Sequence, residues 1–273
     1  MSGKVYGVIA GNGRFPVLVL EEARRQGLDV VAIGIKGEAS DAIESVATRT
    51  HWITIAELGR LIDILKQEHV EEVMLAGQVK HVSIFSSLRP DWKLLKLLTS
   101  LKEKNTEALI GGVVKLLEGE GIRVVDSTVL LKRLLADLGP MTRRKPSKDE
   151  EAEAAYGRSI AAALSGFDIG QSVVISERAC VALEAMEGTD AMLRRAASLA
   201  TGRRLTLVKG SGRRRHMLFD VPVAGLETIA VMQQTGTTML AVDAGRTLLL
   251  DREQMLGAAD AAGICVAGYP PHE

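Results

Sequence analysis

Short apolar runs alternate with amphipathic stretches over the first half of the chain. The apolar runs are rich in valine and isoleucine and predict β-strands over Val5 to Ala10, Asp29 to Ile35, Glu72 to Ala76 and Ile122 to Val125. The amphipathic stretches predict helices over 16–26, 57–69, 92–104 and 106–118. Strands without a polar face are typical of a sheet covered on both sides. The alternation therefore predicts an N-terminal Rossmann-like, doubly wound parallel sheet.

The rhythm breaks between Leu134 and Asp149, where Gly139-Pro140 is followed by the basic run Arg143-Arg144-Lys145. Glycine and proline end helices, and a basic run favours solvent. We therefore expect an N-terminal domain over 1–134, a linker over 135–148 and a second domain over 149–273.

The second half has a different pattern, with helices and shorter apolar runs in mixed order. Helices are expected over 150–164, 190–199, 226–234 and 252–262, and single strands near 204–208, 217–221 and 264–269. Two hairpins are expected, one turning at Glu177-Arg178 and one running from Met239 to Leu250. This half predicts a C-terminal α+β domain with a mixed sheet.

Composition narrows the class of protein. The 273 residues are 47% hydrophobic and 25% charged, which is ordinary for a folded chain, and 34 Lys+Arg balance 34 Asp+Glu. A chain without net charge has no global attraction for nucleic acid, so we expect no nucleic-acid partner. Cys180 and Cys265 lie in apolar runs and are interpreted as core residues. The start does not resemble a signal peptide, and no apolar run approaches the roughly 20 residues of a membrane span. We expect a cytoplasmic protein, with any membrane contact at the inner face of the inner membrane.

Two glycine-containing turns follow strands of the first half. Gly11, Asn12 and Gly13 lead into a helix near Pro16, and Gly77, Gln78 and Val79 follow a later strand. Glycines let the backbone approach a phosphate, and the helix start directs free N–H groups to the same place. Pro16 replaces the third glycine of a dinucleotide fingerprint, and no acidic residue follows the second strand. A phosphate cradle and a plain tight turn both remain open, and His81 alone is a weak signal.

A basic amphipathic helix is expected from Asp91 to Leu101, with Leu94, Leu97 and Leu98 on one face. Such a helix can lie on an anionic membrane. Packing against the sheet is the commoner arrangement, and we favour it.

Candidate chemistry in the second half starts with the string from Glu184 to Arg195. Thr189 is a good N-cap and Asp190 suits the positive end of the helix, but capping does not explain Glu184 or Glu187. Farther on, Lys209 opens a glycine-containing basic loop, which either binds phosphate oxygens or is simply solvated. Asp220 then stands inside an apolar stretch, which favours a role as metal ligand or general base in a cleft.

These segments together resemble the LpxI family. The resemblance runs nearly end to end and is carried by Ile9-Ala10-Gly11-Asn12-Gly13, Leu75-Ala76-Gly77-Gln78-Val79, Asp168-Ile169-Gly170-Gln171, Glu184-Ala185-Met186-Glu187-Gly188-Thr189-Asp190-Ala191-Met192-Leu193-Arg194-Arg195 and Phe219-Asp220-Val221-Pro222-Val223-Ala224-Gly225. The long string from Glu184 is the most specific of these. Asn12 departs from the family pattern, in which a further glycine is common.

The resemblance implies a hydrolase of lipid A biosynthesis that splits UDP-2,3-diacylglucosamine into UMP and 2,3-diacylglucosamine 1-phosphate with Mg²⁺ or Mn²⁺, between two domains. It implies that Asp220 is the essential aspartate. On this basis we expect Asp220 and Asp190 to hold the metal, and the substrate to contact Gly11, Asn12, Gly13, Gly77, Gln78, Val79, Gln171, Glu187, Gly188, Thr189, Asp190 and Lys209. The expected partner is the lipid-linked UDP-sugar, with its acyl chains sheltered between the domains or along the helix from Trp92. A homo-oligomer is left open.

Two rival functions fit part of the pattern. The first half alone resembles that of a nicotinamide-dependent oxidoreductase, although its fingerprint is incomplete. A non-catalytic nucleotide-binding regulatory protein would share the same sheet and glycine turns, but would have no turnover to lose when Asp220 is replaced.

Overall fold

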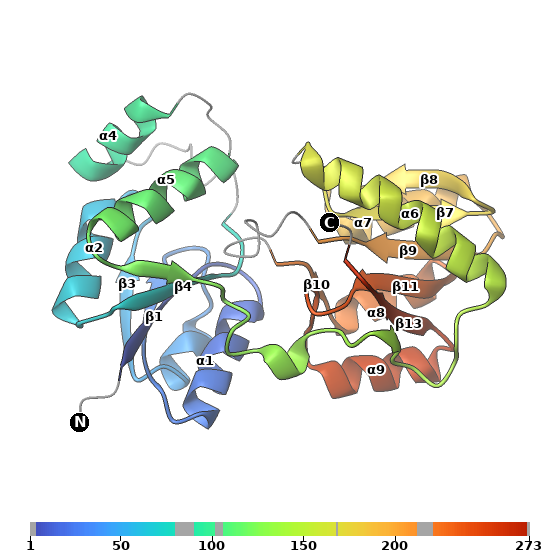
Figure 1. Cartoon of the computed structure of the whole chain (residues 1–273), viewed down its shortest axis with the longest axis horizontal. Coiled ribbons are helices and arrows are strands. Elements are labelled where there is room, and N and C mark those ends of the chain that lie inside the picture. Colours follow the sequence, from blue (N-terminus) through green and yellow to red (C-terminus); the bar gives the residue numbers. More distant parts are fainter. Residues whose placement is uncertain (1–3, 80–89, 102–105, 168, 212–220, 272–273) are drawn as a thin grey trace. The chain divides into compact units, whose positions relative to one another are not determined.

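The chain divides into two compact units, Met1–Leu131 and Lys132–Glu273 (Figure 1). The computed structural model describes residues 4–79, 90–101, 106–167, 169–211 and 221–271, without the side chains of 106 and 107. Each unit has its own sheet and its own core. Within the described residues, none of the helices has both the length and the apolar character that a membrane crossing requires.

The first unit is built on a five-stranded parallel sheet in the order β3-β2-β1-β4-β5. Its strands are β1 (Val5–Ala10), β2 (Asp29–Ile35), β3 (Arg49–Ile53), β4 (Glu72–Ala76) and β5 (Arg123–Val125). Its helices are α1 (Phe15–Arg25), the 3-10 turn η1 (Asp41–Ser45), α2 (Leu58–Gln67), α4 (Trp92–Ser100) and α5 (Thr106–Gly119). The parallel order confirms the predicted Rossmann-like sheet.

Alternate residues of the central strands point to opposite faces of this sheet, and both faces are buried. Val31 and Ile33 of β2 belong to the cluster formed with Leu61 and Leu65 of α2 and Leu117 of α5. The residues between them are equally buried, as expected for strands with helices on both sides. The periodicity of two thus disappears from the sequence, which is why the strands appear as continuous apolar runs.

Helix α4 settles the choice left by the amphipathic pattern. Leu94 is buried in the core of the first unit, and Leu97, Leu98 and Leu101 pack against the same cluster. Asp91 caps the helix, accepting a hydrogen bond from the Leu94 amide at 2.8 Å. The helix thus packs within its own unit as favoured, but chiefly against α2 and α5, so the expectation that it would lie directly on the sheet is corrected.

The second unit has a six-stranded mixed sheet in the order β6-β13-β11-β9-β7-β8. Its strands are β6 (Gly139–Pro140), β7 (Ser172–Ser176), β8 (Ala179–Leu183), β9 (Leu205–Lys209), β11 (Thr237–Asp243) and β13 (Cys265–Tyr269), and a separate parallel pair is formed by β10 (Val223–Ala224) and β12 (Leu248–Leu249). Its helices are the 3-10 turn η2 (Lys132–Leu134), α6 (Lys148–Gly166), α7 (Thr189–Leu199), α8 (Leu226–Gln234) and α9 (Arg252–Ala261). The predicted α+β domain with a mixed sheet is confirmed.

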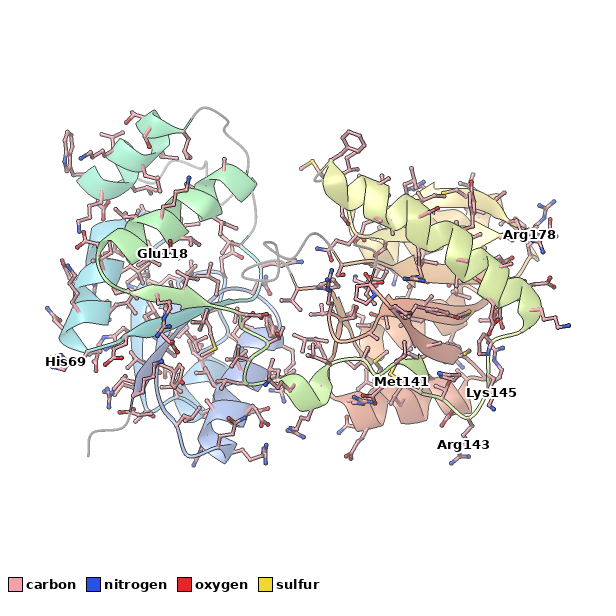
Figure 2. The ribbon with its side chains drawn as sticks, viewed as in Figure 1. His69, Glu118, Met141, Arg143, Lys145 and Arg178 are labelled. Carbon is pink, nitrogen blue, oxygen red and sulfur yellow. The ribbon has the colours of Figure 1, made fainter. Side chains whose placement is uncertain are left out.

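One of the two predicted hairpins is present. Strands β7 and β8 pair antiparallel, and Glu177 and Arg178 between them both have positive φ, 49° and 63°, as the tight hairpin turns require; Figure 2 labels Arg178 at this turn. The prediction of a second hairpin from Met239 to Leu250 is wrong. After β11 the chain turns away from it, and β12 pairs in parallel with β10. The apolar run at 248–250 is therefore a strand of a different pair.

The segment interpreted as a linker is held against the second unit. Gly139 and Pro140 pair with Gly268 and Ala267 of β13, and the Met141 amide donates to the Val266 carbonyl at 2.8 Å. Arg144 lies in a bidentate ion pair with the buried Glu150 at 2.8 and 2.9 Å. The sequence predicted a solvated basic run, but Arg144 of this run neutralises the buried carboxylate of Glu150.

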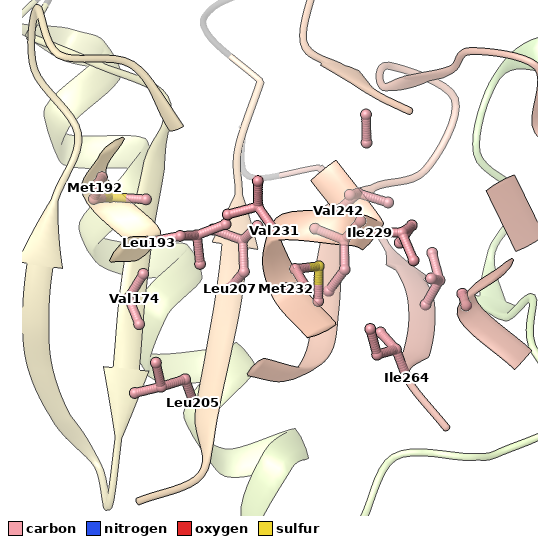
Figure 3. Packing of buried hydrophobic residues seen from close by; sticks show 14 of the residues in the cluster. Val174, Met192, Leu193, Leu205, Leu207, Ile229, Val231, Met232, Val242 and Ile264 are labelled. Atoms are coloured by element: carbon pink, nitrogen blue, oxygen red, sulfur yellow. The ribbon is translucent and has the colours of Figure 1, made fainter. Parts of the chain in front are cut away.

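The main core of the second unit lies between the sheet and α7, α8 and α9. Figure 3 shows Met192 and Leu193 of α7 next to Val174 of β7 and Leu207 of β9, with Met232 of α8 close by. Cys265 is buried in a second cluster beside α6, as the sequence predicted for both cysteines, whereas Cys180 is half-buried. Burial raises the pKa of both thiols, which keeps them in the neutral form.

Candidate functional site

The first unit changes winding direction between β1 and β4. The strand order β3-β2-β1-β4-β5 places these two strands side by side while the connections run to opposite sides. In open parallel sheets, ligands bind beyond the carboxyl ends of the strands at this switch point. The turn from Gly11 to Gly13 follows β1, and the turn from Gly77 to Val79 follows β4. The sheet therefore brings the two glycine turns of the sequence together.

These two turns are joined directly by backbone hydrogen bonds. The Asn12 amide donates to the Gln78 carbonyl at 2.6 Å, and the Gln78 amide donates to the Asn12 carbonyl at 3.2 Å. The Gly11 amide donates to the Ala76 carbonyl at 2.8 Å. Three of the N–H groups that could have faced a phosphate are thus already satisfied within the protein.

Glycine is required at two positions by this contact. A Cβ at Gly11 would lie 2.5 Å from the Gln78 carbonyl oxygen, and one at Gly77 would lie 2.5 Å from the Asn12 carbonyl oxygen. Gly77 also has φ +87°. Gly13 differs, because a Cβ there meets nothing within 4 Å and only its φ of +95° favours glycine. Gly13 and the exposed side chains of Asn12 and Gln78 are what this edge leaves available to a ligand.

A single edge of the second sheet gathers polar side chains from most of its strands. Strands β8, β9, β11 and β13 run in one direction and β7 in the other, so four carboxyl ends and the start of β7 share this edge. Polar side chains lie there at Ser172, Glu184, Lys209, Asp243 and Tyr269. We call these residues, with Thr189 and Ser211, the polar edge.

Thr189 is the centre of one half of the polar edge. The buried Lys209 donates to the Thr189 hydroxyl at 2.9 Å, and that hydroxyl donates to Glu184 at 2.8 Å. Ser172 lies 3.4 Å from the same hydroxyl. The N-cap is Gly188, with φ 82°, so the prediction that Thr189 caps α7 is wrong. Its hydroxyl is used by Glu184 and Lys209 instead of by the helix end.

Glu187 and Gln171 stabilise the loops around this group. Glu187 accepts from Arg195 at 2.5 Å and from the Ala185 amide at 3.1 Å, and the hydrogen bond from Arg195 lowers the pKa of Glu187. The Gln171 carbonyl accepts from the Gly210 amide at 2.8 Å. Glu187 therefore holds the loop before α7 through Arg195 and the Ala185 amide, a role that helix capping does not explain.

The other half of the polar edge is centred on Asp243, which sequence reasoning missed. Asp243 is 3% exposed and accepts from both the amide and the hydroxyl of Ser211 at 2.7 Å. Arg158 of α6 lies 3.7 Å from its other oxygen and stacks over the Tyr269 ring at 5.2 Å. Burial raises the pKa of Tyr269 to about 12, so its hydroxyl stays protonated. Asp243 ends an apolar strand and gave no motif signal.

Several predicted residues lie outside the described part of the chain. Asp220 is among them, with His81, Asp168, residues 212–216 of the basic loop that Lys209 opens and most of the strand expected at 217–221. The described residues on either side of 212–220 are held by hydrogen bonds. Ser211 donates to Asp243, and the Pro222 carbonyl accepts from the Leu248 amide at 2.9 Å. The stretch from Asp243 to Leu248 therefore holds both flanks of the segment that contains Asp220.

Metal ligation is not completed by the described residues. Asp190 is half-buried in the first turn of α7, and the other expected ligand is Asp220. Across the described ranges, no three His, Cys, Asp or Glu side chains are grouped as a metal ion would require. A metal site at Asp190 and Asp220 stays a prediction.

Comparisons with known proteins cover almost the whole chain. Residues 5–134 match the LpxI N-terminal domain and residues 137–267 match the LpxI C-terminal domain. The curated UDP-2,3-diacylglucosamine pyrophosphatase LpxI of Caulobacter vibrioides is 31% identical over 277 residues, covering 98% of both chains.

Two solved structures show a distant likeness to this chain. UDP-glucose 4-epimerase from Bifidobacterium longum, in complex with NAD+ and UDP, is 15% identical with a TM-score of 0.30, over 53% of this chain and 42% of that one. L-amino acid ligase from Bacillus licheniformis is 14% identical with a TM-score of 0.28, over 68% of this chain and 40% of that one. Likeness at this level carries no argument about function. From the two domain matches and the curated relative, the chain belongs to the LpxI family.

Proposed function

We propose that the protein hydrolyses the diphosphate bond of UDP-2,3-diacylglucosamine, releasing UMP and 2,3-diacylglucosamine 1-phosphate in lipid A biosynthesis. The observation that carries the proposal is the relative of that name, 31% identical over 98% of both chains. The two domain matches cover both units, so the glycine turns and all of the polar edge except Tyr269 lie inside them. Membership of this family speaks against the nicotinamide-dependent oxidoreductase that the first half alone resembles.

The polar edge supplies the chemistry that diphosphate hydrolysis needs from a protein. A diphosphate resists water because its negative oxygens repel the nucleophile and because its leaving group is charged. The ammonium group of Lys209 is buried, carries three N–H groups and is held by Thr189 at 2.9 Å. A cation in this position neutralises a phosphate oxygen more strongly than one in water. In this proposal Lys209 contacts the diphosphate, with Gln171, Glu187, Gly188, Thr189 and Asp190 around it.

The glycine turns of the first unit are the proposed contact for another part of the substrate. Gly11 and Gly77 bring the two turns together, and Asn12, Gly13 and Gln78 are exposed there, while the half-buried Val79 packs against the core of the first unit. The switch point of an open α/β sheet is the usual place for a nucleotide. The bonds between Asn12 and Gln78 make this surface stiff, so a ligand would meet it already formed.

A divalent ion, Mg²⁺ or Mn²⁺, would neutralise phosphate charge and orient a water molecule when bound. Asp190 supplies a carboxylate of the kind that Mg²⁺ prefers, and Asp220 is proposed as the second ligand and as the essential carboxylate. The described residues alone do not form a complete metal site, so metal dependence rests on Asp220. A cytoplasmic location, beside the inner face of the inner membrane that holds the lipid, is part of the same proposal.

The test is direct. Purified full-length protein is incubated with UDP-2,3-diacylglucosamine and Mg²⁺, and nucleotides are separated by chromatography. We expect UMP and 2,3-diacylglucosamine 1-phosphate in equal amounts, and no release when a chelator is present. Absence of UMP under every divalent-ion condition would refute the proposed activity.

Two substitutions test the roles proposed for Asp220 and Lys209. Asp220→Ala should abolish turnover while the substrate still raises the melting temperature, because ligand binding stabilises the native state. Asp149→Ala, at an exposed aspartate, is its control. Lys209→Met should lower kcat/KM about 10- to 100-fold, as expected for the loss of one charged hydrogen bond. Exposed Lys148→Met should not change it. Loss of turnover in both controls would point to damage of the fold instead.

A further inference from the structure

Four large apolar side chains are exposed beside the polar edge. Met186 is 93% exposed and Phe167 77%, and Ile169 and Leu183 are 48% and 40% exposed. We call these four residues the apolar patch. Single exposed apolar residues are common on proteins, but a group of large ones on adjoining segments marks a binding surface.

The apolar patch comes from two segments in direct contact. Val173 pairs with Leu183, and the Glu184 amide donates to the Ser172 carbonyl at 2.9 Å. The backbones approach so closely that a Cβ at Gly170 would lie 2.2 Å from the Glu184 carbonyl oxygen. All four residues are within three positions of this Gly170–Glu184 contact, so their Cα atoms lie within about 11 Å of it.

The same contact leads directly into the proposed phosphate site. Glu184 stands between Leu183 and Met186 in the chain and accepts from Thr189 at 2.8 Å, and Thr189 accepts from Lys209 at 2.9 Å. On the other segment, Gln171 and Ser172 directly follow Ile169 and Gly170. A buried cation and an exposed apolar surface therefore belong to one continuous region of the second unit.

A molecule that fits this region has an anionic head next to an apolar chain. We propose that the apolar patch binds an acyl chain of the lipid-linked substrate while its phosphate contacts Lys209. This inference rests on the proposed function. In 2,3-diacylglucosamine 1-phosphate the phosphate is on C1 and the acyl groups are on C2 and C3 of the same sugar ring, so a short separation between cation and apolar surface is what this substrate needs.

The alternative occupant is the surface of an anionic membrane, and the local charge disfavours it. Glu184 lies in the same short segment as Leu183 and Met186, and its carboxylate would be repelled by anionic lipid, whereas Glu187 is neutralised by its ion pair with Arg195. An acyl chain bound one molecule at a time meets no such surface charge. From the sequence, the acyl chains were expected between the domains or along the helix from Trp92. The apolar patch belongs wholly to the second unit, whereas α4 belongs to the first.

The test compares substrates with long and short acyl chains, using full-length protein. In the double variant Phe167→Ser, Met186→Ser we expect KM for long-chain UDP-2,3-diacylglucosamine to rise roughly tenfold with kcat unchanged, because a contact made equally in the ground and transition states is lost. KM for the short-chain form should stay the same. Leu199→Ser is the control, because Leu199 is 64% exposed at the far end of α7, about 15 Å along the helix from Thr189.

Each other result overturns the inference. An equal change for both substrates, or no change for either, excludes acyl-chain binding at the apolar patch. Loss of binding to anionic vesicles with unchanged kinetics assigns the patch to a membrane, and a changed sedimentation coefficient assigns it to a second copy of the chain. If the double variant melts at a lower temperature than wild type, Met186→Ser alone replaces it.

The two proposals fail separately. If wild-type protein releases no UMP, the proposed function is refuted. Binding of long-chain 2,3-diacylglucosamine 1-phosphate, measured by equilibrium dialysis, then still tests the patch. Equal affinity of wild type and the double variant would refute it.

Discussion

Glu150 is the residue at which the structure makes its sharpest prediction about stability. It is 1% exposed in the first turn of α6 and accepts hydrogen bonds from Arg144 at 2.8 and 2.9 Å, from the Ser147 amide at 2.8 Å and from Thr238 at 2.7 Å. Burial alone would raise its pKa. The hydrogen bonds outweigh burial and lower the pKa from 4.5 to about 2.

The size of the effect follows from this pKa. Each tenfold change in proton affinity is worth about 1.4 kcal/mol, so the ionised carboxylate favours the folded state by about 3 kcal/mol. Glu150→Gln should lower the free energy of unfolding of the second unit by about that amount near neutral pH, since Arg144 loses its counter-charge. The contribution is complete above pH 4.5 and disappears as the pH falls toward the folded-state pKa of about 2.

Amide hydrogen exchange is the suitable assay. Both tryptophans, Trp52 and Trp92, lie in the first unit, so their fluorescence does not report on the second. Exchange of the buried amides of β9 and β11 gives the free energy of opening of the second unit in the full-length protein. Glu151→Gln, at the exposed neighbouring glutamate, is the control.

Two results would show that the ion pair between Arg144 and Glu150 does not stabilise the second unit as expected. If Glu150→Gln and Glu151→Gln exchange alike near neutral pH, the ion pair with Arg144 contributes nothing to stability. If the difference between wild type and Glu150→Gln does not shrink as the pH approaches the folded-state pKa of Glu150, its charge is not the cause.

Two further predictions concern the candidate site. Gly77→Ala should destabilise the first unit by about 1 to 3 kcal/mol, because its Cβ would lie 2.5 Å from the Asn12 carbonyl oxygen at φ +87°. Gly111→Ala, in the open middle of α5, should stabilise it by up to about 1 kcal/mol, and tryptophan-monitored denaturation compares the two. Asp243→Asn should lower kcat and speed exchange of the Ser211 amide, which loses a charged acceptor. The expected loss of kcat rests on Asp243 holding Ser211, at one flank of the segment that contains Asp220, so slower turnover with unchanged Ser211 exchange would contradict this role.

The sequence predicted elements best where local pattern and burial agree. Strand β2 was predicted from Asp29 to Ile35, which are its bounds in the structure, because every residue after the first is buried and apolar. Strand β3 was missed. It is the edge strand Arg49–Ile53, half-exposed and largely polar, so its residues lack the apolar run that marks the central strands. Its position depends on pairing with β2, which no local signal encodes.

In the candidate site too, the sequence indicated residues that lie in local strings and missed those that depend on contacts between distant segments. Thr189 stands in a string that resembles the family, Lys209 opens a basic loop, and the structure brings the two to 2.9 Å from each other. Asp243 was not found, because its partner Ser211 is 32 residues away and the two meet only through the pairing of β9 with β11. The same holds for the bonds between Asn12 and Gln78, since the sequence left a phosphate cradle and a plain tight turn open and no local signal shows that the two turns bond to each other.

The stretch from Asp243 to Leu248 has a consequence for how the protein tolerates changes in length. Asp243 binds the Ser211 amide at 2.7 Å, and the Leu248 amide binds the Pro222 carbonyl at 2.9 Å. The stretch between Asp243 and Leu248 therefore fixes the distance between Ser211 and Pro222. Insertions between residues 212 and 220 would leave both attachments in place. A single deletion between Asp243 and Leu248 would move one attachment relative to the other, although it lies outside every family string that points to function.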